Sequence, residues 1–352
     1  MSYVNKNIRI GKHTLGTGHP PYVIAEMSGN HNQNINRAFQ IIDAAVGAGV
    51  QAVKLQTYTA DTITLDHDGD EFLVDQGLWA GRRLYELYEE AHTPWDWHKP
   101  LFDHAAKNDI AIFSSPFDKT AIDLLEDLNA PAYKIASFEI IDLPLIRYAA
   151  ETGKPLIMST GLATKDEIGE AIEAVRECGN PNLVVLHCVS GYPSDPAESN
   201  LNTMMDIARE FDVLIGLSDH SYGIAVPVAA TALGACVIEK HLTLSRAEGG
   251  VDSDFSLEPQ EFSDLVTNCS TAYAALGKVD YDLKASEVEN QRFRRSLYVV
   301  ADIGAGAVLN AENIRSIRPG LGLKPKYYDK VIGKKATRDI ARGSPLSWDM
   351  LE

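Results

Sequence analysis

The chain of 352 residues has a formal net charge of −17, with 45% apolar and 23% charged residues, a composition typical of globular proteins. Its length fits a barrel of roughly 250 residues followed by a small module. The acidic balance argues against a nucleic-acid or membrane-surface protein, because the excess negative charge would repel phosphate backbones and anionic lipid.

The N-terminal stretch MSYVNKNIRIGKHTLG has no apolar core, so it predicts no signal peptide. We expect a β-hairpin cap within the first twenty residues. No run of about 18 apolar residues occurs, so no membrane span is predicted. The four cysteines are far apart and form no CxxC pattern, which is typical of reduced, buried thiols in a cytoplasmic protein.

A regular alternation fills the first 275 residues, where short apolar runs are separated by longer amphipathic segments. Continuous apolar runs of this kind are typical of parallel strands buried on both faces. Eight alternations favour a closed (β/α)8 TIM barrel of the α/β class over an open doubly wound sheet, and no GxGxxG turn follows the first run. The eight runs are Tyr22–Met27, Ala52–Gln56, Ala111–Ser115, Ala132–Ser137, Pro155–Thr160, Leu183–Cys188, Val213–Asp219 and Cys236–Leu242.

Two of the intervening segments predict helices clearly. Asn34–Ala48 carries apolar residues at near-helical spacing. Thr164–Cys178 begins with Thr-Lys-Asp-Glu, in which Glu167 stands three residues after Thr164 as in a capping box. Gly179 follows as a C′ residue, so this helix has sequence signals at both ends.

Two further segments depart from the alternation. The interval from Thr57 to Thr93 is too long for an ordinary βα loop, and such insertions on a barrel are usually lids or binding loops. After about Lys284 the chain turns to short elements rich in Gly, Pro and Arg. We therefore expect a barrel with its hairpin cap over residues 1–285 and a separate, mildly basic module over residues 286–352.

Two lysines on the predicted strands, Lys54 and Lys134, indicate an anionic ligand. Buried ammonium groups repel each other and lose hydration unless an anion lies between them. Serine hydroxyls near the carboxyl ends of the strands would complete a cradle for a phosphorylated ligand. Each serine taken alone is explained equally well as a hydrogen-bonded interior side chain. The serines concerned are Ser115, Ser137, Ser159 and Ser218.

Other strand-end residues predict a metal and acid–base chemistry. His220 and His241 end neighbouring strands, in the runs SDH and EKH. Two imidazoles with nearby carboxylates could hold a divalent Mn, Mg, Fe or Zn ion, while two hydrogen-bonded histidines are the alternative. Glu26 is a candidate general base or acid, because a dry cavity raises the pKa of a carboxyl group. Asp252, after the eighth strand, could contact substrate hydroxyls.

Eight motifs in chain order carry a resemblance to a known family, the sialic acid synthase family. The family condenses phosphoenolpyruvate with an amino-sugar aldehyde to give nine-carbon 2-keto acids. The resemblance covers nearly the whole chain, and it implies a (β/α)8 barrel followed by an antifreeze-like (SAF) domain, which Ser296–Glu352 resembles. The motifs are IAEMSGNHN, AVKLQTY, FSSPFD, YKIASFEI, MSTGLAT, LHCVSGYPS, GLSDHS and EKHLTL.

The resemblance also implies residue roles. Phosphoenolpyruvate would be held by Lys54, Ser115, Lys134, Ser137, Ser159 and Ser218. A divalent metal, Mn or Mg, would bind His220 and His241, and Glu26 would handle protons near the attacked carbon. The sugar would be touched by Gln56, Tyr192, Asp252 and Ser190, the last standing where many sialic acid synthases have an asparagine. Arg318 of a partner subunit would reach the barrel mouth, in a domain-swapped homodimer.

Within the family, the insertion LWAGRRLYELYEEAHTPWDWH and the run GGVDSDFSLEP resemble the pseudaminic acid branch. That branch uses 2,4-diacetamido-2,4,6-trideoxy-L-altrose as its sugar. The N-acetylneuraminate and legionaminic acid branches are the alternatives within the family. Alternatives of other classes are an aldolase that forms a Schiff base on Lys134 or Lys240, and a carbohydrate- or ice-binding role for the C-terminal module.

Overall fold

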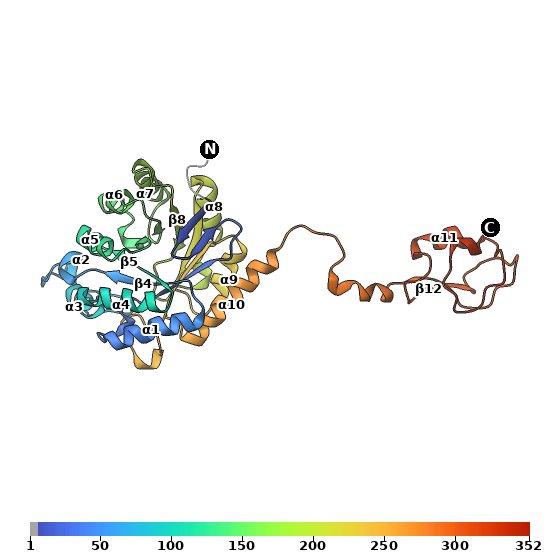
Figure 1. Ribbon diagram of the computed structural model, residues 1–352, viewed down its shortest axis with the longest axis horizontal. Coiled ribbons are helices and arrows are strands. Elements are labelled where there is room, and N and C mark those ends of the chain that lie inside the picture. The colour runs from blue at the N-terminus through green and yellow to red at the C-terminus, as the bar shows by residue number, and fades with distance from the viewer. Residues whose placement is uncertain (1–5) are drawn as a thin grey trace. The chain divides into compact units, whose positions relative to one another are not determined.

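The computed structural model describes residues 6–352 (Figure 1). The chain divides into two compact units, of which the first ends at Gly277 and the second covers Lys278–Glu352. The domain boundary predicted after residue 285 stays a prediction. Within the described part of the chain, no helix is long and apolar enough to cross a membrane.

Eight parallel strands of the first unit close into a barrel, in the ring order β10-β3-β4-β5-β6-β7-β8-β9. Each predicted apolar run coincides with one strand to within two residues, so the predicted TIM barrel is confirmed. The strands are β3 (Tyr22–Glu26), β4 (Ala52–Thr57), β5 (Ala111–Pro116), β6 (Tyr133–Ile135), β7 (Leu156–Ser159), β8 (Leu183–Cys188), β9 (Leu214–Asp219) and β10 (Val237–His241).

Helices surround the barrel (Figure 1). The predicted capping box is present at the start of α7, where Thr164 N donates to Glu167 Oε2 at 2.7 Å and Glu167 N donates to Thr164 Oγ1 at 3.3 Å. The helices of this unit are α1 (Ile35–Ala48), α2 (Ala60–Ile63), α3 (Leu84–Ala91), α4 (Trp95–Lys107), α5 (Lys119–Asp127), α6 (Leu143–Glu151), α7 (Lys165–Glu177), α8 (Asn202–Phe211), α9 (Ala225–Ala232) and α10 (Pro259–Leu276).

The barrel interior is closed at the N-terminal ends of its strands. The antiparallel strands β1 (Asn7–Ile10) and β2 (His13–Gly16) lie where the sequence predicts a hairpin cap, and residues 1–5 lie outside the described chain. Three hairpin side chains, Ile8, Ile10 and Leu15, pack in one buried cluster with interior residues of the barrel strands. The opposite, carboxyl end of the barrel is therefore the end left for a site.

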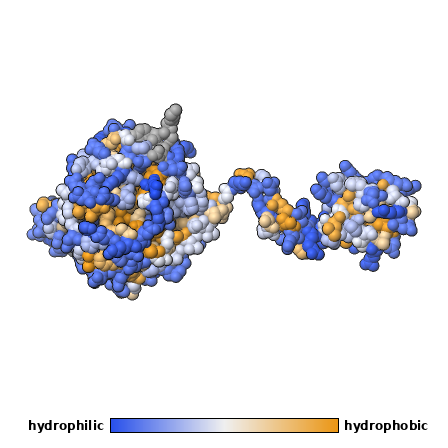
Figure 2. Space-filling model, viewed as in Figure 1, coloured by the Kyte–Doolittle hydropathy of each residue, from blue (hydrophilic) through white to orange (hydrophobic). Residues whose placement is uncertain are grey.

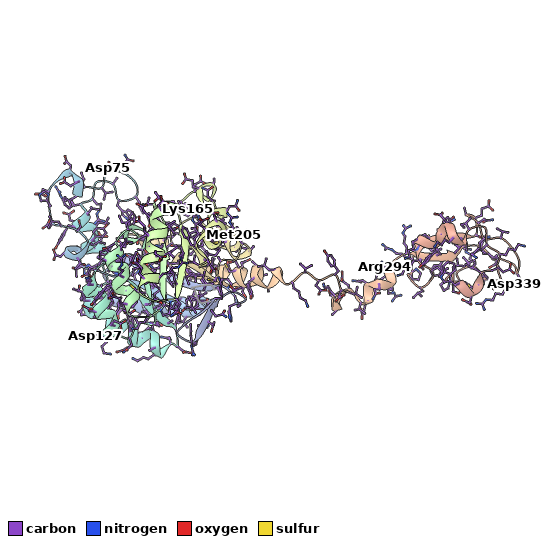
Figure 3. All side chains as sticks on the ribbon, turned by 90° about the horizontal axis from the view of Figure 1, so that it is seen from above. Asp75, Asp127, Lys165, Met205, Arg294 and Asp339 are labelled. Atoms are coloured by element: carbon purple, nitrogen blue, oxygen red, sulfur yellow. The ribbon has the colours of Figure 1, made fainter. Side chains whose placement is uncertain are left out.

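The long insertion between β4 and α4 contains α2 and α3. Figure 3 places Asp75 of this insertion and Asp127, at the end of α5, on opposite sides of the unit. This is expected, because the insertion follows the carboxyl end of a strand whereas a barrel helix ends near the amino ends of the strands. On the face drawn in Figure 2, hydrophilic residues cover most of the surface of the unit.

The second unit is small and has its own core. Strands β11 (Ser296–Val299) and β12 (Ile314–Ile317) pair antiparallel, and the short helix α11 spans Tyr328–Val331. Nine buried apolar residues fill this core: Leu297, Val299, Ile303, Leu309, Ile314, Val331, Ala336, Ile340 and Leu346. Arg318 follows β12 directly and is exposed.

Candidate active site

A buried ion pair links the first two barrel strands at their carboxyl ends. The register sets Glu26 of β3 beside Lys54 of β4, and Lys54 Nζ lies 2.6 Å from Glu26 Oε2. Gln56 Nε2 donates to the other carboxylate oxygen at 3.0 Å. Burial raises the pKa of Glu26, although the charge of Lys54 opposes that shift. The raised pKa makes this carboxyl group a stronger base than an exposed glutamate, and therefore a candidate to accept a proton.

A second buried carboxylate, Glu239 of β10, lies between the two lysines. Its Oε1 atom is 3.8 Å from Lys54 Nζ and 3.5 Å from Lys134 Nζ. Burial lowers the pKa of Lys134, and Glu239 only partly offsets this. For Lys54 burial also acts to lower the pKa, but Glu239 and Glu26 together raise it above the ordinary value. An incoming anion would therefore stabilise the charge of Lys134 most.

The four serines predicted to bind an anion are all buried on the barrel strands or just after them. Ser115 Oγ accepts from Lys54 Nζ at 3.2 Å, and Ser218 Oγ donates to Glu239 Oε1 at 3.1 Å. Within residues 6–352, Ser159 Oγ has no hydrogen-bond partner, so a ligand oxygen could supply one.

Ser137 and Ser190 meet at Gly161. A Cβ atom on Gly161 would lie 2.7 Å from Ser137 Oγ and 2.1 Å from Ser190 Oγ, so only glycine leaves room there. Gly161 N also donates to Ser137 Oγ at 3.2 Å. The Gly161 backbone and both hydroxyl groups therefore lie close together. Ser190, which lies in the loop after β8, is thus a neighbour of Ser137, one of the serines predicted to bind an anion.

The two predicted metal ligands lie close together, with the ring centroids of His220 and His241 5.4 Å apart. His220 Nδ1 is 3.1 Å from the carbonyl oxygen of Val189, which leaves Nε2 available. His241 Nδ1 is buried and has no hydrogen-bond partner among the described residues, and it lies 4.0 Å from Asp252 Oδ2. Burial holds the pKa of His241 well below its ordinary value, so the ring is neutral, as a metal ligand must be.

Within residues 6–352, no group of three or more His, Cys, Asp and Glu side chains is placed to hold a metal ion. The two imidazoles nevertheless fit such an ion, because a buried unpaired nitrogen and a nearby carboxylate offer ligands. Water and substrate would have to complete the coordination, as in catalytic sites with open positions.

The residues predicted to touch a sugar surround this pair. Tyr192 packs against His220 with ring centroids 4.4 Å apart. Gln56 Nε2 lies 3.2 Å from Ser28 Oγ, and Ser28 in turn donates to Asp252. Gln56, Tyr192 and Asp252 are therefore gathered at one end of the barrel with Glu26.

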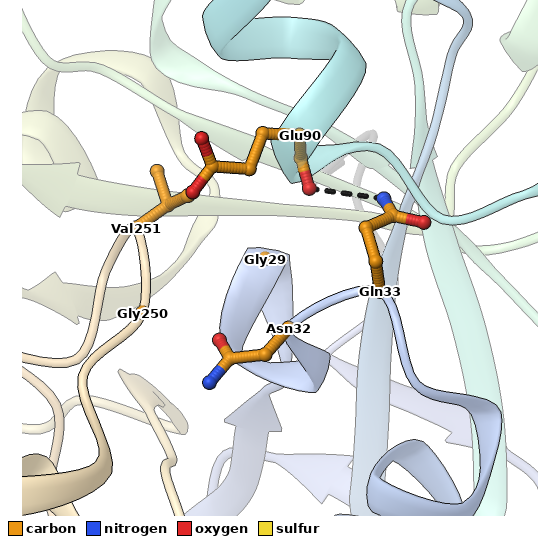
Figure 4. A pocket seen from close by; sticks show the side chains of 6 residues that line it. All are labelled: Gly29, Asn32, Gln33, Glu90, Gly250 and Val251. Atoms are coloured by element: carbon orange, nitrogen blue, oxygen red, sulfur yellow. Dashed lines mark hydrogen bonds between the residues drawn. The ribbon is translucent and has the colours of Figure 1, made fainter.

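A hollow of about 250 Å³ adjoins this end of the barrel (Figure 4). Two of its lining residues, Gly29 and Val251, are the chain neighbours of Ser28 and Asp252. Gln33 and Glu90 also line this hollow, and Gln33 Nε2 donates to the backbone oxygen of Glu90 at 2.9 Å. The remaining lining residues are Asn32 and Gly250.

Three further residues lie at the site, although no role was predicted for them from the sequence. Glu239 bridges the two lysines. Cys188 Sγ lies 3.9 Å from His220 Nδ1. Glu139 follows β6, and burial raises its pKa to about 7. The alternation of side chains along a strand could have identified Cys188 and Glu239. Both stand an even number of residues from side chains of the same strand that point into the barrel.

Lys240, the second lysine considered for a Schiff base, lies outside this cluster. It is buried beside Asp219, which the register sets opposite it, and its ammonium group donates to Asp219 and to the carbonyl oxygen of Ser221. Neighbouring residues on a strand face opposite sides, so Glu239 and Lys240 cannot both point into the barrel.

Comparison with known proteins identifies the family to which both parts of the chain are similar. Residues 41–281 match the NeuB family, and residues 294–352 match the SAF domain. The pseudaminic acid synthase of Helicobacter pylori is 44% identical over 334 residues, which are 95% of this chain and 98% of that protein. The N,N'-diacetyllegionaminic acid synthase of Legionella pneumophila is 33% identical over 336 residues, 94% of each chain.

A solved structure shares the fold. The N-acetylneuraminic acid (sialic acid) synthetase of Leptospira borgpetersenii, crystallised in complex with citrate, has a TM-score of 0.72 at 32% identity. The match covers 81% of this chain and 94% of that one.

Proposed function

Because the chain belongs to the NeuB family, we propose that it joins phosphoenolpyruvate to 2,4-diacetamido-2,4,6-trideoxy-L-altrose, with addition of water and release of phosphate, to give pseudaminic acid. Identity of 44% to a pseudaminic acid synthase, against 33% to a legionaminic acid synthase, favours this sugar. The protein is thus an enzyme of carbohydrate biosynthesis that forms a carbon–carbon bond.

One structural observation carries the proposal for phosphoenolpyruvate. Lys54 and Lys134 are both buried, and both lie within 3.8 Å of the same oxygen of Glu239. Glu26 and Glu239 balance the charges of the two ammonium groups, but Lys134 Nζ lies 3.5 Å from Glu239, so the phosphate or carboxylate of phosphoenolpyruvate would give Lys134 a closer counter-charge. Ser115, Ser137 and Ser159 would donate to the phosphate oxygens, and Ser218 would do so by giving up its hydrogen bond to Glu239.

We assign the steps of this reaction to residues of the cluster as follows. Lys54 and Lys134 would orient phosphoenolpyruvate so that its C3 faces the sugar aldehyde, and would offset the negative charge of the phosphate group that leaves from C2. Glu26 would take the proton of the water that adds to C2, before phosphate leaves. A divalent metal held by His220 and His241 would polarise the aldehyde as a Lewis acid.

The proposed sugar is tested by a screen that measures phosphate release. Purified enzyme with phosphoenolpyruvate and Mn²⁺ should release phosphate with 2,4-diacetamido-2,4,6-trideoxy-L-altrose at a higher kcat/KM than with N-acetylmannosamine or 2,4-diacetamido-2,4,6-trideoxymannose. Each acceptor alone is the blank. A preference for N-acetylmannosamine would refute the proposed branch, though not the condensation.

Metal removal is expected to lower turnover about 10²-fold or more, because a Lewis acid contributes several kcal/mol at the transition state. Enzyme dialysed against EDTA should regain activity when Mn²⁺ or Mg²⁺ is added. In a matched binding experiment, Mn²⁺ titrated into the wild type should give a bound EPR signal that His220→Gln loses. Full turnover after complete chelation would refute the metal role.

We also propose the domain-swapped homodimer, in which Arg318 of one subunit serves the barrel of the other. In its support, the segment 276–293 exposes an unusual number of large apolar side chains, and such surfaces mark protein interfaces (Figure 2). They are Leu276, Val279, Tyr281, Leu283, Val288 and Phe293.

Mixing two inactive variants tests this exchange. Arg318→Ala lacks the arginine and Lys54→Met lacks a working barrel, so each alone should be nearly inactive. After joint refolding, mixed dimers would contain one complete site and activity should return. Arg315→Ala, which removes a second exposed arginine from the same unit, is the control and should stay active. Failure of the mixture to recover activity, with a dimer present in ultracentrifugation, would contradict the exchange.

A further inference from the structure

A series of packed aromatic rings runs from the long insertion to the two histidines. The ring centroid of Trp79 lies 5.6 Å from that of Tyr192, which lies 4.4 Å from His220 and 5.3 Å from Phe255. Phe255 in turn packs edge-on against His241 at 4.9 Å. Segments far apart in the sequence therefore combine into one apolar wall beside the candidate metal ligands.

The indole of Trp79 is fixed at its polar edge. Its Nε1 atom donates to the backbone oxygen of Val251 at 2.9 Å, one residue before Asp252. Trp has a single hydrogen-bond donor and no acceptor on its side chain, so this bond uses the whole polar capacity of the ring. The rest of the Trp79 side chain is apolar.

We propose that Trp79 and Tyr192 form a wall that selects acceptor sugars without a hydroxyl group at C6. The inference rests on the proposed function, which sets the aldehyde carbon of the sugar beside His220 and His241. An extended six-carbon chain spans about 6 Å, given C–C bonds of ~1.5 Å. A sugar that lies along the wall would bring its far end to the ring of Tyr192 and towards that of Trp79.

The chemistry of the wall explains the selection. A C6 methyl group that packs against the rings is removed from water, which makes the free energy of binding more favourable. A C6 hydroxyl packed on the Trp79 ring loses its hydrogen bonds to water, and the indole has no donor left to replace them. A hydrophobic wall of this kind discriminates against an added hydroxyl by up to about 10²-fold.

The test compares two acceptors that differ in one oxygen atom: 2,4-diacetamido-2,4,6-trideoxy-L-altrose and its 6-hydroxy counterpart. The wild type should favour the 6-deoxy sugar in kcat/KM by about 10-fold or more. Trp79→Ala should bring that ratio close to one, while KM for phosphoenolpyruvate stays unchanged. Trp79→Phe, which keeps a ring, should retain most of the preference, and it covers the case in which the alanine variant does not fold.

Leu78→Ala is the matched control, since Leu78 adjoins Trp79 and is 46% exposed; it should keep the wild-type ratio. Equal rates with both sugars in the wild type, or an unchanged ratio in a folded Trp79→Ala variant, would overturn the inference while the condensation stands. Wild-type enzyme that releases phosphate with neither sugar would overturn the proposed function, and the inference with it.

Discussion

Replacing Lys54 by methionine is expected to lower kcat/KM for phosphoenolpyruvate by roughly 30- to 4000-fold, which corresponds to about 2–5 kcal/mol for one partner of a buried charge pair. Lys54 is within hydrogen-bond or ion-pair distance of Glu26, Glu239 and Ser115, so it holds the cluster together. Phosphate release measured against phosphoenolpyruvate concentration gives the effect directly. A value of kcat/KM within a few-fold of wild type would contradict the proposed anion site.

The same change should cost about 3–5 kcal/mol of unfolding free energy, because Glu26 and Glu239 stay buried with less counter-charge. Chemical denaturation measures this loss. The double variant Lys54→Met, Glu26→Gln is the control, since it removes both partners of the 2.6 Å pair. It should regain stability but not activity, which would separate the catalytic role of Lys54 from its structural one.

Glu26→Gln is expected to reduce turnover about 10²- to 10⁴-fold with both substrates saturating, the usual effect of losing a positioned acid–base group. Glutamine keeps the size of the side chain and can still meet Gln56 and Lys54, but it cannot accept the proton of the attacking water. Rapid-quench measurement of phosphate release in a single turnover would locate the loss in the chemical step. Near-normal turnover would exclude Glu26 as the base.

Glu139 provides the comparison for that experiment. Its Oε2 atom is buried without a hydrogen-bond partner among the described residues, and its pKa of about 7 would also suit a proton carrier. We expect Glu139→Gln to affect turnover much less than Glu26→Gln, because Glu26 contacts Lys54, whereas Glu139 forms no ion pair within residues 6–352. The opposite result would assign the proton transfer to Glu139.

Much of the barrel could be predicted because its signals are local. Strands buried on both faces require continuous apolar runs, and the run at Leu183–Cys188 matches β8 at both ends. That Glu26 and Lys54 lie close together could also be predicted from the sequence. Consecutive strands of a barrel pair in parallel, with their carboxyl ends together.

The rest depended on contacts between distant segments. Alternation along β10 puts Glu239 and Lys240 on opposite faces, but only the closed ring shows that Glu239 meets Lys134 and that Lys240 pairs with Asp219. Likewise, Trp79 stands in an irregular insertion with no periodic pattern, so nothing local predicts its packing against Tyr192. Irregular loops are placed by tertiary contacts rather than by propensity.

The hairpin β1–β2 has a consequence for the order of events. Ile8, Ile10 and Leu15 close the barrel at the N-terminal ends of its strands. Substrates, water and products would therefore all pass through the carboxyl end. A nine-carbon acid bound at that end would block a phosphate bound deeper in the barrel, so we expect the acid to leave before the phosphate.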